Sequence, residues 1–249
     1  MDDVAGDQWD HVGIAPESRL VVAVVVGKRT GEAAREVVGQ FAERTGEVPP
    51  ALITTDDCNA YAGPLMEQYG VLVVPERTGR RGRPRRPRQQ WPEGSAYATV
   101  NKEYRRGKVV STKRTLVHGD PEDLKAALAT SSVSAEVNTA FIERQNGTDR
   151  NYNARKARKT YEFSKVLLMH LAATCWVFFC YNFHHPNRGL RQRQANGTYL
   201  QFTPAMAAGL ATRPWSVAEI ITTQVVGFVP SLKATPADFG GWCSRGHAP

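Results

Sequence analysis

A valine-rich run near the N-terminus constrains the fold of this chain most. RLVVAVVVG, residues 19–27, holds five valines and no polar residue after its first position. Valine favours strands, and a nearly unbroken apolar run is typical of a strand covered on both faces. Since both faces must be covered, we expect a layered α/β fold.

The flanking segments supply the other layers. Residues 8–15 indicate a strand that pairs with the valine run through a turn at residues 16–18. Thr30 is placed to cap a helix that ends near Gly46. Its apolar positions recur at helical spacing: Ala33, Ala34, Val37, Val38 and Phe41.

The following segments continue this alternation. A short apolar strand from Ala51 stops at Asp56, a helix covers about residues 61–69, and VLVV from Val71 predicts a further strand. The order β–β–α–β–α–β indicates a mixed sheet with helices on its faces.

The composition changes at residue 76. Residues 76–94 contain seven arginines with glycine and proline, which predicts a flexible loop without a packed core. Residues 96–120 predict a basic two-stranded ribbon with a turn at Arg106 and Gly107, and residues 120–132 a short polar connector.

Two helices are predicted next, at about residues 137–157 and 163–183, and an irregular segment with short helical pieces follows. The apolar run at 166–181 has 16 residues, fewer than the roughly 20 that a membrane helix needs. We therefore expect a buried helix with Trp176, Phe178 and Phe179 in the core. We expect residues 1–221 to form the core, with a basic insertion and connector at 76–136, and residues 222–249 to form a weakly ordered tail.

Charge and cysteine content narrow the class of protein. The net charge of +8 and a pI near 9.5 favour a polyanionic partner, nucleic acid first and an anionic membrane second. A basic protein without such a partner is the alternative. The four cysteines lack zinc-site spacing, so Cys175 and Cys180 are expected to be reduced core thiols of a cytosolic protein. The polar, acidic N-terminus predicts no signal peptide.

Two acids are candidates for metal binding. Asp56 ends a strand, where ligands gather in α/β sheets, although the neighbouring Asp57 suits a helix N-cap equally well. Glu143, Asn146 and Arg150 share one face of a predicted helix. A carboxylate, an amide and a guanidinium in a row suit Mg²⁺ and a phosphodiester, and a solvated helix face is the alternative. Gly147 costs about 1 kcal/mol of helix propensity and suggests a close approach to the backbone.

Six stretches together resemble the catalytic region of bacterial DDE transposases of the insertion sequence 1 family. In the family's order they are SRLVVAVVVGKRT (18–30), ITTDDCNAY (53–61), FIERQNGTDR (141–150), RKTYEFSK (158–165), YNFHHPNRGLR (181–191) and TPAMAAGL (203–210). The resemblance implies an RNase H-like fold and a carboxylate triad that binds two divalent metal ions, Mg²⁺ or Mn²⁺. Asp56 would be the second acid, Glu143 the third, and Asn146 and Arg150 would accompany the glutamate.

The first acid of the triad has no clear counterpart. The resemblance implies that this chain starts after the family's DNA-binding region and after the strand with the first aspartate. Ala15 stands where related sequences tend to carry an aspartate, and Asp7 and Asp10 match no motif. We therefore expect either a transposase core, with metal-dependent cleavage and strand transfer, or an inactive remnant that binds DNA or inhibits a full-length transposase.

The resemblance also implies which residues contact DNA. The expected partners are element ends and target DNA, bound by a homo-oligomer in the bacterial cytoplasm at the nucleoid, with no membrane partner. A set of bases would neutralise phosphates, with a solvated surface as the alternative. They are Arg144, Arg150, Arg155, Lys156, Arg158 and Lys159, with Arg81, Arg83, Arg85 and Arg86 in the arginine-rich loop.

Overall fold

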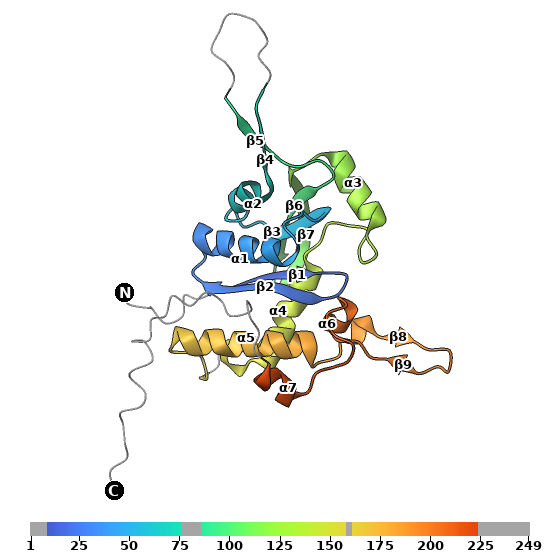
Figure 1. The fold of residues 1–249 in the computed structure, drawn as a ribbon. Helices are drawn as coiled ribbons and strands as arrows, with labels where there is room; N and C mark the ends of the chain where they lie inside the picture. The colour runs from blue at the N-terminus through green and yellow to red at the C-terminus, as the bar shows by residue number, and fades with distance from the viewer. Residues whose placement is uncertain (1–8, 76–85, 158–160, 224–249) are drawn as a thin grey trace, which may run out of the picture.

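A computed structural model describes residues 9–75, 86–157 and 161–223 (Figure 1). The elements in the first half are β1 (Trp9–Ala15), β2 (Leu20–Gly27), α1 (Gly31–Arg44), β3 (Leu52–Asp56), α2 (Ala62–Tyr69), β4 (Val71–Val73), β5 (Arg88–Gln90), β6 (Ala96–Arg105) and β7 (Lys108–His118). Those in the second half are α3 (Pro121–Thr130), α4 (Ala140–Tyr152), the 3₁₀ turn η1 (Ala154–Lys156), α5 (Leu167–Phe183), the 3₁₀ turn η2 (Arg188–Leu190), β8 (Gln192–Arg193), β9 (Tyr199–Leu200), α6 (Pro204–Ala207) and α7 (Val217–Thr222).

The valine run forms β2, which pairs antiparallel with β1. Helices α1 and α5 lie on opposite sides of this pair (Figure 1). Ala23 and Val25 pack in the cluster that includes α1, whereas Val24 packs with Phe178 and Tyr181 of α5. The predicted burial of both faces of this strand is therefore confirmed.

A second sheet has the order β3-β6-β7, with β3 parallel to β6 and β7 antiparallel to it. One hydrophobic cluster joins β2 and α1 to α2 and to Tyr97, a fully buried residue of β6. The molecule is therefore a mixed α/β protein with a mixed sheet flanked by helices, as the order of elements predicted.

Local signals explain several boundaries. The Thr30 hydroxyl accepts the backbone N–H of Ala33 and caps α1 as predicted. The predicted turn of the basic ribbon is present between β6 and β7, where Arg106 has φ 49° and Gly107 has φ 77°. A left-handed pair of this kind matches the twist of a two-residue hairpin. The buried half of β6 belongs to the three-stranded sheet, so the ribbon extends that sheet.

Two expectations about the middle of the chain are wrong. The polar connector is helix α3, whose Leu124 and Leu128 pack beside Ala98 and Val100 of β6. The expected core-free loop ends in Trp91, a buried residue whose indole N–H donates to the carbonyl of Ser95. Trp91, between a glutamine and a proline in the sequence, is thus part of the hydrophobic core.

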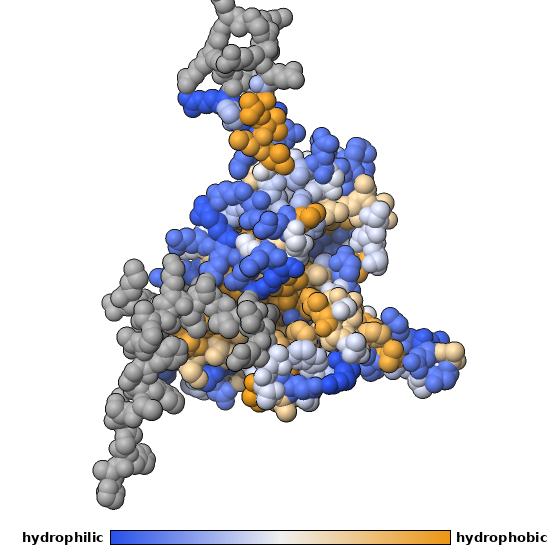
Figure 2. Space-filling model, in the orientation of Figure 1, coloured by the Kyte–Doolittle hydropathy of each residue, from blue (hydrophilic) through white to orange (hydrophobic). Residues whose placement is uncertain are grey.

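The strand predicted from Val71 is present as β4. β4 pairs with β5 in a two-stranded ribbon, and Val71, Leu72 and Val74 are exposed. They form an apolar patch on the surface in Figure 2. Residues 76–85 of the arginine-rich loop lie outside the described residues.

Helix α5 is the apolar run near residue 170. Phe178 and Phe179 are buried as expected, but the side of α5 with Trp176 faces outward, and this residue is 42% exposed, so its predicted core position is wrong. By length and composition, Leu167–Leu190 is the single described helix that could cross a membrane, with 44% of its most apolar window buried in the protein. Asn182 holds α5 to β2 by exchanging two hydrogen bonds with the backbone of Val21. These contacts agree with a core helix in a compact α/β fold.

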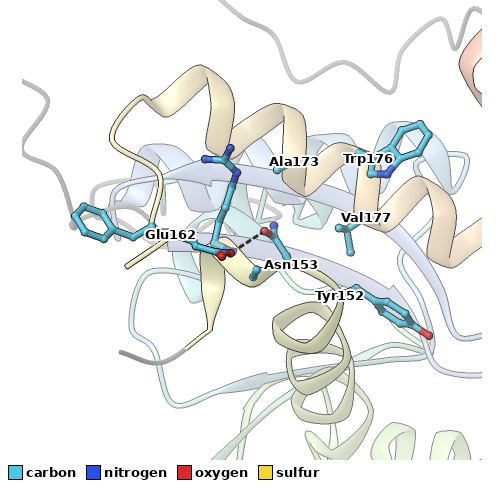
Figure 3. Close-up of a pocket in the computed structure, with 9 residues that line it drawn as sticks. Tyr152, Asn153, Glu162, Ala173, Trp176 and Val177 are labelled. Carbon is cyan, nitrogen blue, oxygen red and sulfur yellow. Dashed lines mark hydrogen bonds between the residues drawn. The ribbon is translucent and has the colours of Figure 1, made fainter. Parts of the chain in front are cut away.

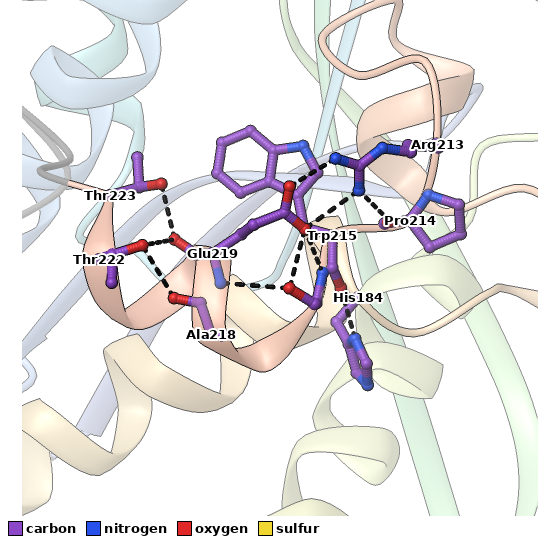
Figure 4. A network of polar contacts seen from close by, with 9 residues as sticks. His184, Arg213, Pro214, Trp215, Ala218, Glu219, Thr222 and Thr223 are labelled. Atoms are coloured by element: carbon purple, nitrogen blue, oxygen red, sulfur yellow. Dashed lines mark hydrogen bonds and ion pairs between the residues drawn. The ribbon is translucent and has the colours of Figure 1, made fainter.

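The segment after α5 ends in α7, and polar contacts hold this segment together and attach it to the end of α5 (Figure 4). His184 contacts the carbonyl of Trp215 through Nδ1 at 2.6 Å, and Arg213 pairs with Glu219. Ser216 and Glu219 form a capping box at the start of α7. Most of the predicted tail, residues 224–249, lies outside the described residues.

Candidate functional site

A cavity of about 450 Å³ lies where the start of β1, the end of β3, helix α4 and the start of α5 meet. Three of the residues predicted for a catalytic site line it, namely Asp56 from β3 with Asn146 and Arg150 from α4. These side chains come from segments that are far apart in the sequence. The cavity is thus a candidate site that the sequence partly anticipated.

Asp56 is an open carboxylate at the end of its strand. Its side chain is 65% exposed, and Arg29 Nη2 lies 3.6 Å from its Oδ2. Asp57 accepts a hydrogen bond from the Asn101 amide at 2.7 Å, and the N-cap of α2 is Tyr61. The alternative role of Asp57 as a helix cap is therefore wrong.

Glu143 lies in the first turn of α4 and is 49% exposed. Its Oε1 accepts hydrogen bonds from the Lys102 ammonium and from the Thr139 hydroxyl. Burial raises the pKa of Glu143, but these two contacts outweigh burial and leave the pKa below its usual value. Glu143 does not line the cavity that holds Asn146 and Arg150.

Strand β6 connects the surroundings of the two acids. Asp56 is the register partner of Val100, and Lys102, two residues further along β6, binds Glu143. Convergence of the Asp56 and Glu143 carboxylates on one metal pair stays a prediction.

Sequence reasoning missed a buried charge cluster in the cavity wall. Lys156 of η1 lies with its Nζ 2.8 Å from Asp10 Oδ2 and 2.7 Å from Asp149 Oδ2. His170 Nε2 of α5 lies 3.2 Å from Asp10 Oδ1. The Lys156 side chain is 7% exposed, so its single positive charge is buried and shared between these two carboxylates. The expected role of Lys156 at a DNA phosphate is thus corrected to a role inside the protein.

The pKa values of the two aspartates in this cluster shift in opposite directions. Burial raises the pKa of Asp10, but hydrogen bonds and charge from His170 and Lys156 outweigh it, and the pKa is lowered. Burial raises the pKa of Asp149, and Lys156 only partly offsets this. Asp149 Oδ1 is buried and has no hydrogen-bond partner in the described part of the chain. Asp10 therefore holds its charge more firmly than Asp149.

Apart from Lys156, the predicted DNA-contacting bases that the structure describes divide into two groups. Arg150 and Arg155 line the cavity, together with Arg29 and Lys165, which the sequence did not single out. Arg144 and Arg86 are exposed. The remaining predicted bases lie outside the described residues: Arg81, Arg83, Arg85, Arg158 and Lys159.

The donor set suits a hard divalent cation only in part. Carboxylate oxygens are the ligands that Mg²⁺ prefers, and Asp56 and Glu143 are both solvent-accessible. Within the described ranges, no three His, Cys, Asp or Glu side chains converge as a metal site. Comparison with known proteins finds no matching family model, no matching curated protein and no matching solved structure.

Proposed function

We propose that this chain is the RNase H-like core of a DDE transposase, which cleaves DNA at insertion-sequence ends and transfers the strand to a target. The main support for the proposal is the set of residues that line the first cavity. Asp56, Asn146 and Arg150, which the resemblance selects from two distant motifs, line one cavity with a surplus of cationic side chains. A bacterial cytoplasmic location at the nucleoid and a homo-oligomer on DNA belong to the same proposal.

Each residue has a distinct role in this proposal. Asp56 and Glu143 would hold Mg²⁺ or Mn²⁺, which stabilises negative charge on a reacting phosphodiester. Arg150 and Arg155 bind phosphate oxygens, and Asn146 orients one of them through its amide. Asp10 is the described aspartate on β1 that lines the same cavity, so it is the candidate for the first acid within the described residues.

The experiment is a cleavage and strand-transfer assay on insertion-sequence ends with Mg²⁺ or Mn²⁺. We expect Asp56→Asn and Glu143→Gln to lower activity by about a hundredfold or more, since lost transition-state stabilisation of a few kcal/mol has this effect. The matched control is Glu122→Gln, because Glu122 pairs with Lys125 at the surface of α3. The variants Asp10→Asn and Asp7→Asn test which of these aspartates is the first acid, because the variant that lacks it should lose cleavage activity. Equal activity in the Glu143→Gln variant and the wild type would contradict the assignment.

Metal binding gives a readout that does not require activity. Calorimetric titration with Mn²⁺ should show weaker binding in Asp56→Asn and Glu143→Gln than in Glu122→Gln. Unchanged Mn²⁺ affinity in both site variants would remove these acids as ligands, whatever the cleavage assay shows.

A non-catalytic DNA-binding protein is the second candidate. It is favoured because cations of the chain already pair with the candidate acids, with Arg29 at Asp56, Lys102 at Glu143 and Lys156 at Asp10. In that case the wild-type chain binds DNA and competes with an active transposase, but it neither cleaves nor joins DNA with either metal.

A further inference from the structure

A second cavity of about 500 Å³ lies beside the candidate site, between the end of α4, the turn η1 and the outer side of α5 (Figure 3). Its size is that of a small-ligand pocket. Arg155 and Phe163 line both cavities. The second cavity is therefore adjacent to the place where the proposed function puts a DNA phosphate.

The wall of this cavity offers aromatic surface to solvent. Trp176 is 42% exposed and Phe163 is 48% exposed, although both are large and apolar. Tyr152 also lines the cavity, but one of its faces is stacked on His185, with ring centroids 4.8 Å apart and 12° between the planes. Exposed aromatic rings beside a cationic groove are the platforms on which single nucleobases stack.

A polar group in the same wall has an unmet hydrogen bond. Asn153 is buried, and its Oδ1 accepts the backbone N–H of Arg155 (Figure 3). Its Nδ2 has no partner among the described residues. Buried amides of this kind are nearly always satisfied, so a ligand with an acceptor on its edge would complete the wall. Nucleobases carry such acceptors as carbonyl oxygens and ring nitrogens.

We propose that this cavity holds one unpaired nucleobase of a DNA strand whose phosphate lies at the candidate site. The base stacks on Trp176, its edge accepts a hydrogen bond from Asn153, and Arg155 contacts the adjoining phosphate. This inference rests on the proposed function for the presence of DNA. It adds that the strand is unpaired next to the reacting phosphate.

The test compares binding of two DNA duplexes that differ by a single unpaired nucleotide, measured by fluorescence anisotropy without divalent metal. The wild-type chain should bind the bulged duplex about tenfold more tightly than the paired one, the size of effect that stacking one base on an aromatic ring gives. Trp176→Leu should remove this preference and leave affinity for the paired duplex unchanged. The matched control is Tyr199→Leu, because Tyr199 is 44% exposed and lies in β9; it should keep the preference.

Two further arms make the outcome specific. Asn153→Asp keeps the oxygen that caps η1 but removes the donor, so it should reduce the preference. A 5-iodouracil at the unpaired position should cross-link to Trp176 or Phe163, located by mass spectrometry. Titration with deoxyadenosine monophosphate separates a strand site from a site for free nucleotides, and tight binding of the mononucleotide alone would overturn the strand assignment.

The failures of the two proposals are distinguishable. If the wild-type chain binds paired duplex but shows no preference for the bulge, or if Trp176→Leu retains the preference, the base site is overturned and the proposed DNA function stands. If the wild-type chain binds neither duplex, both proposals fall.

Discussion

Lys156 shows at the scale of single residues how a base that looks solvated can be structural. Its ammonium lies between Asp10 and Asp149, inside the protein. We predict that Lys156→Met lowers the free energy of unfolding by about 3–5 kcal/mol, because it removes the ammonium that two buried carboxylates share. Urea unfolding measures this. The control Lys125→Met removes an exposed pair and should cost about 0.5 kcal/mol or less; equal losses would contradict a buried role for Lys156.

Glu143 gives a prediction about pH. Its folded-state pKa lies below the value of 4.5 of an unperturbed glutamate, because Lys102 and Thr139 bind its carboxylate more strongly than burial opposes it. A lowered pKa adds stability that is present above the unfolded pKa and is lost as the pH falls through the folded pKa. The destabilisation by Glu143→Gln, up to about 1 kcal/mol for a half-exposed pair, should therefore fade below pH 4.5.

A double variant checks the cause of this pH dependence. In a Lys102→Met background the pair is already broken, so Glu143→Gln should have a much smaller effect on urea unfolding at neutral pH. An undiminished effect at neutral pH would show that Lys102 is not the partner that matters.

Residue positions were predictable where an element defines them. Asp56 ends an apolar strand, and Asn146 and Arg150 follow helical spacing, so their presence in one cavity could be anticipated. Asp149 lies between them in the sequence and was missed. An acid in a polar helix has the same local pattern whether it is solvated or buried, and here η1, which follows α4, brings Lys156 back onto it.

At the scale of elements, a strong hydrophobic pattern and a capping residue were sufficient to predict the bounds of a strand or helix. The ends of β2 and α1 follow from the valine run and Thr30. Helix α3 was missed because Pro121, Glu122 and Asp123 were interpreted as loop residues, although proline and acids are favoured in the first turn of a helix. The exposure of β4 could not be predicted, since an apolar run does not reveal which surface covers it.

Gly147 on α4 carries a prediction at this scale. A methyl group there would meet no described atom within 4 Å, so the expected close approach is not made by the described part of the chain. Gly147→Ala should raise the free energy of unfolding by about 1 kcal/mol through helix propensity. If DNA approaches this backbone, the same change should weaken DNA binding severalfold. Gly39→Ala on α1 has equal space and should add stability without changing DNA affinity; identical DNA affinity in both variants would mean that DNA stays away from Gly147.

At the scale of the whole molecule, the general class was accessible from the sequence and the assembly was not. Alternating elements predicted the mixed α/β architecture. The pairing of β6 with β3 depends on contacts between residues about 45 positions apart, which no local pattern encodes. The RNase H-like arrangement and the function therefore depend on the experiments proposed above.

The net charge of +8 raises the question of whether DNA binding arises from overall charge or from the cavity. Arg150→Gln and Arg193→Gln each remove one positive charge, but Arg150 lines the cavity and Arg193 lies in β8. Log affinity falls as log salt concentration rises. If Arg150 neutralises a phosphate, its replacement should make this negative slope shallower by about 0.9, the value for one contact on duplex DNA. Arg193→Gln should leave the slope unchanged. Both slopes can be obtained from fluorescence anisotropy between about 50 and 200 mM salt. Over this range, the affinity of a protein with several phosphate contacts changes by orders of magnitude. Equal slopes in the two variants would indicate that DNA binding depends on the total charge of the protein, and would contradict the proposal that DNA binds at the cavity.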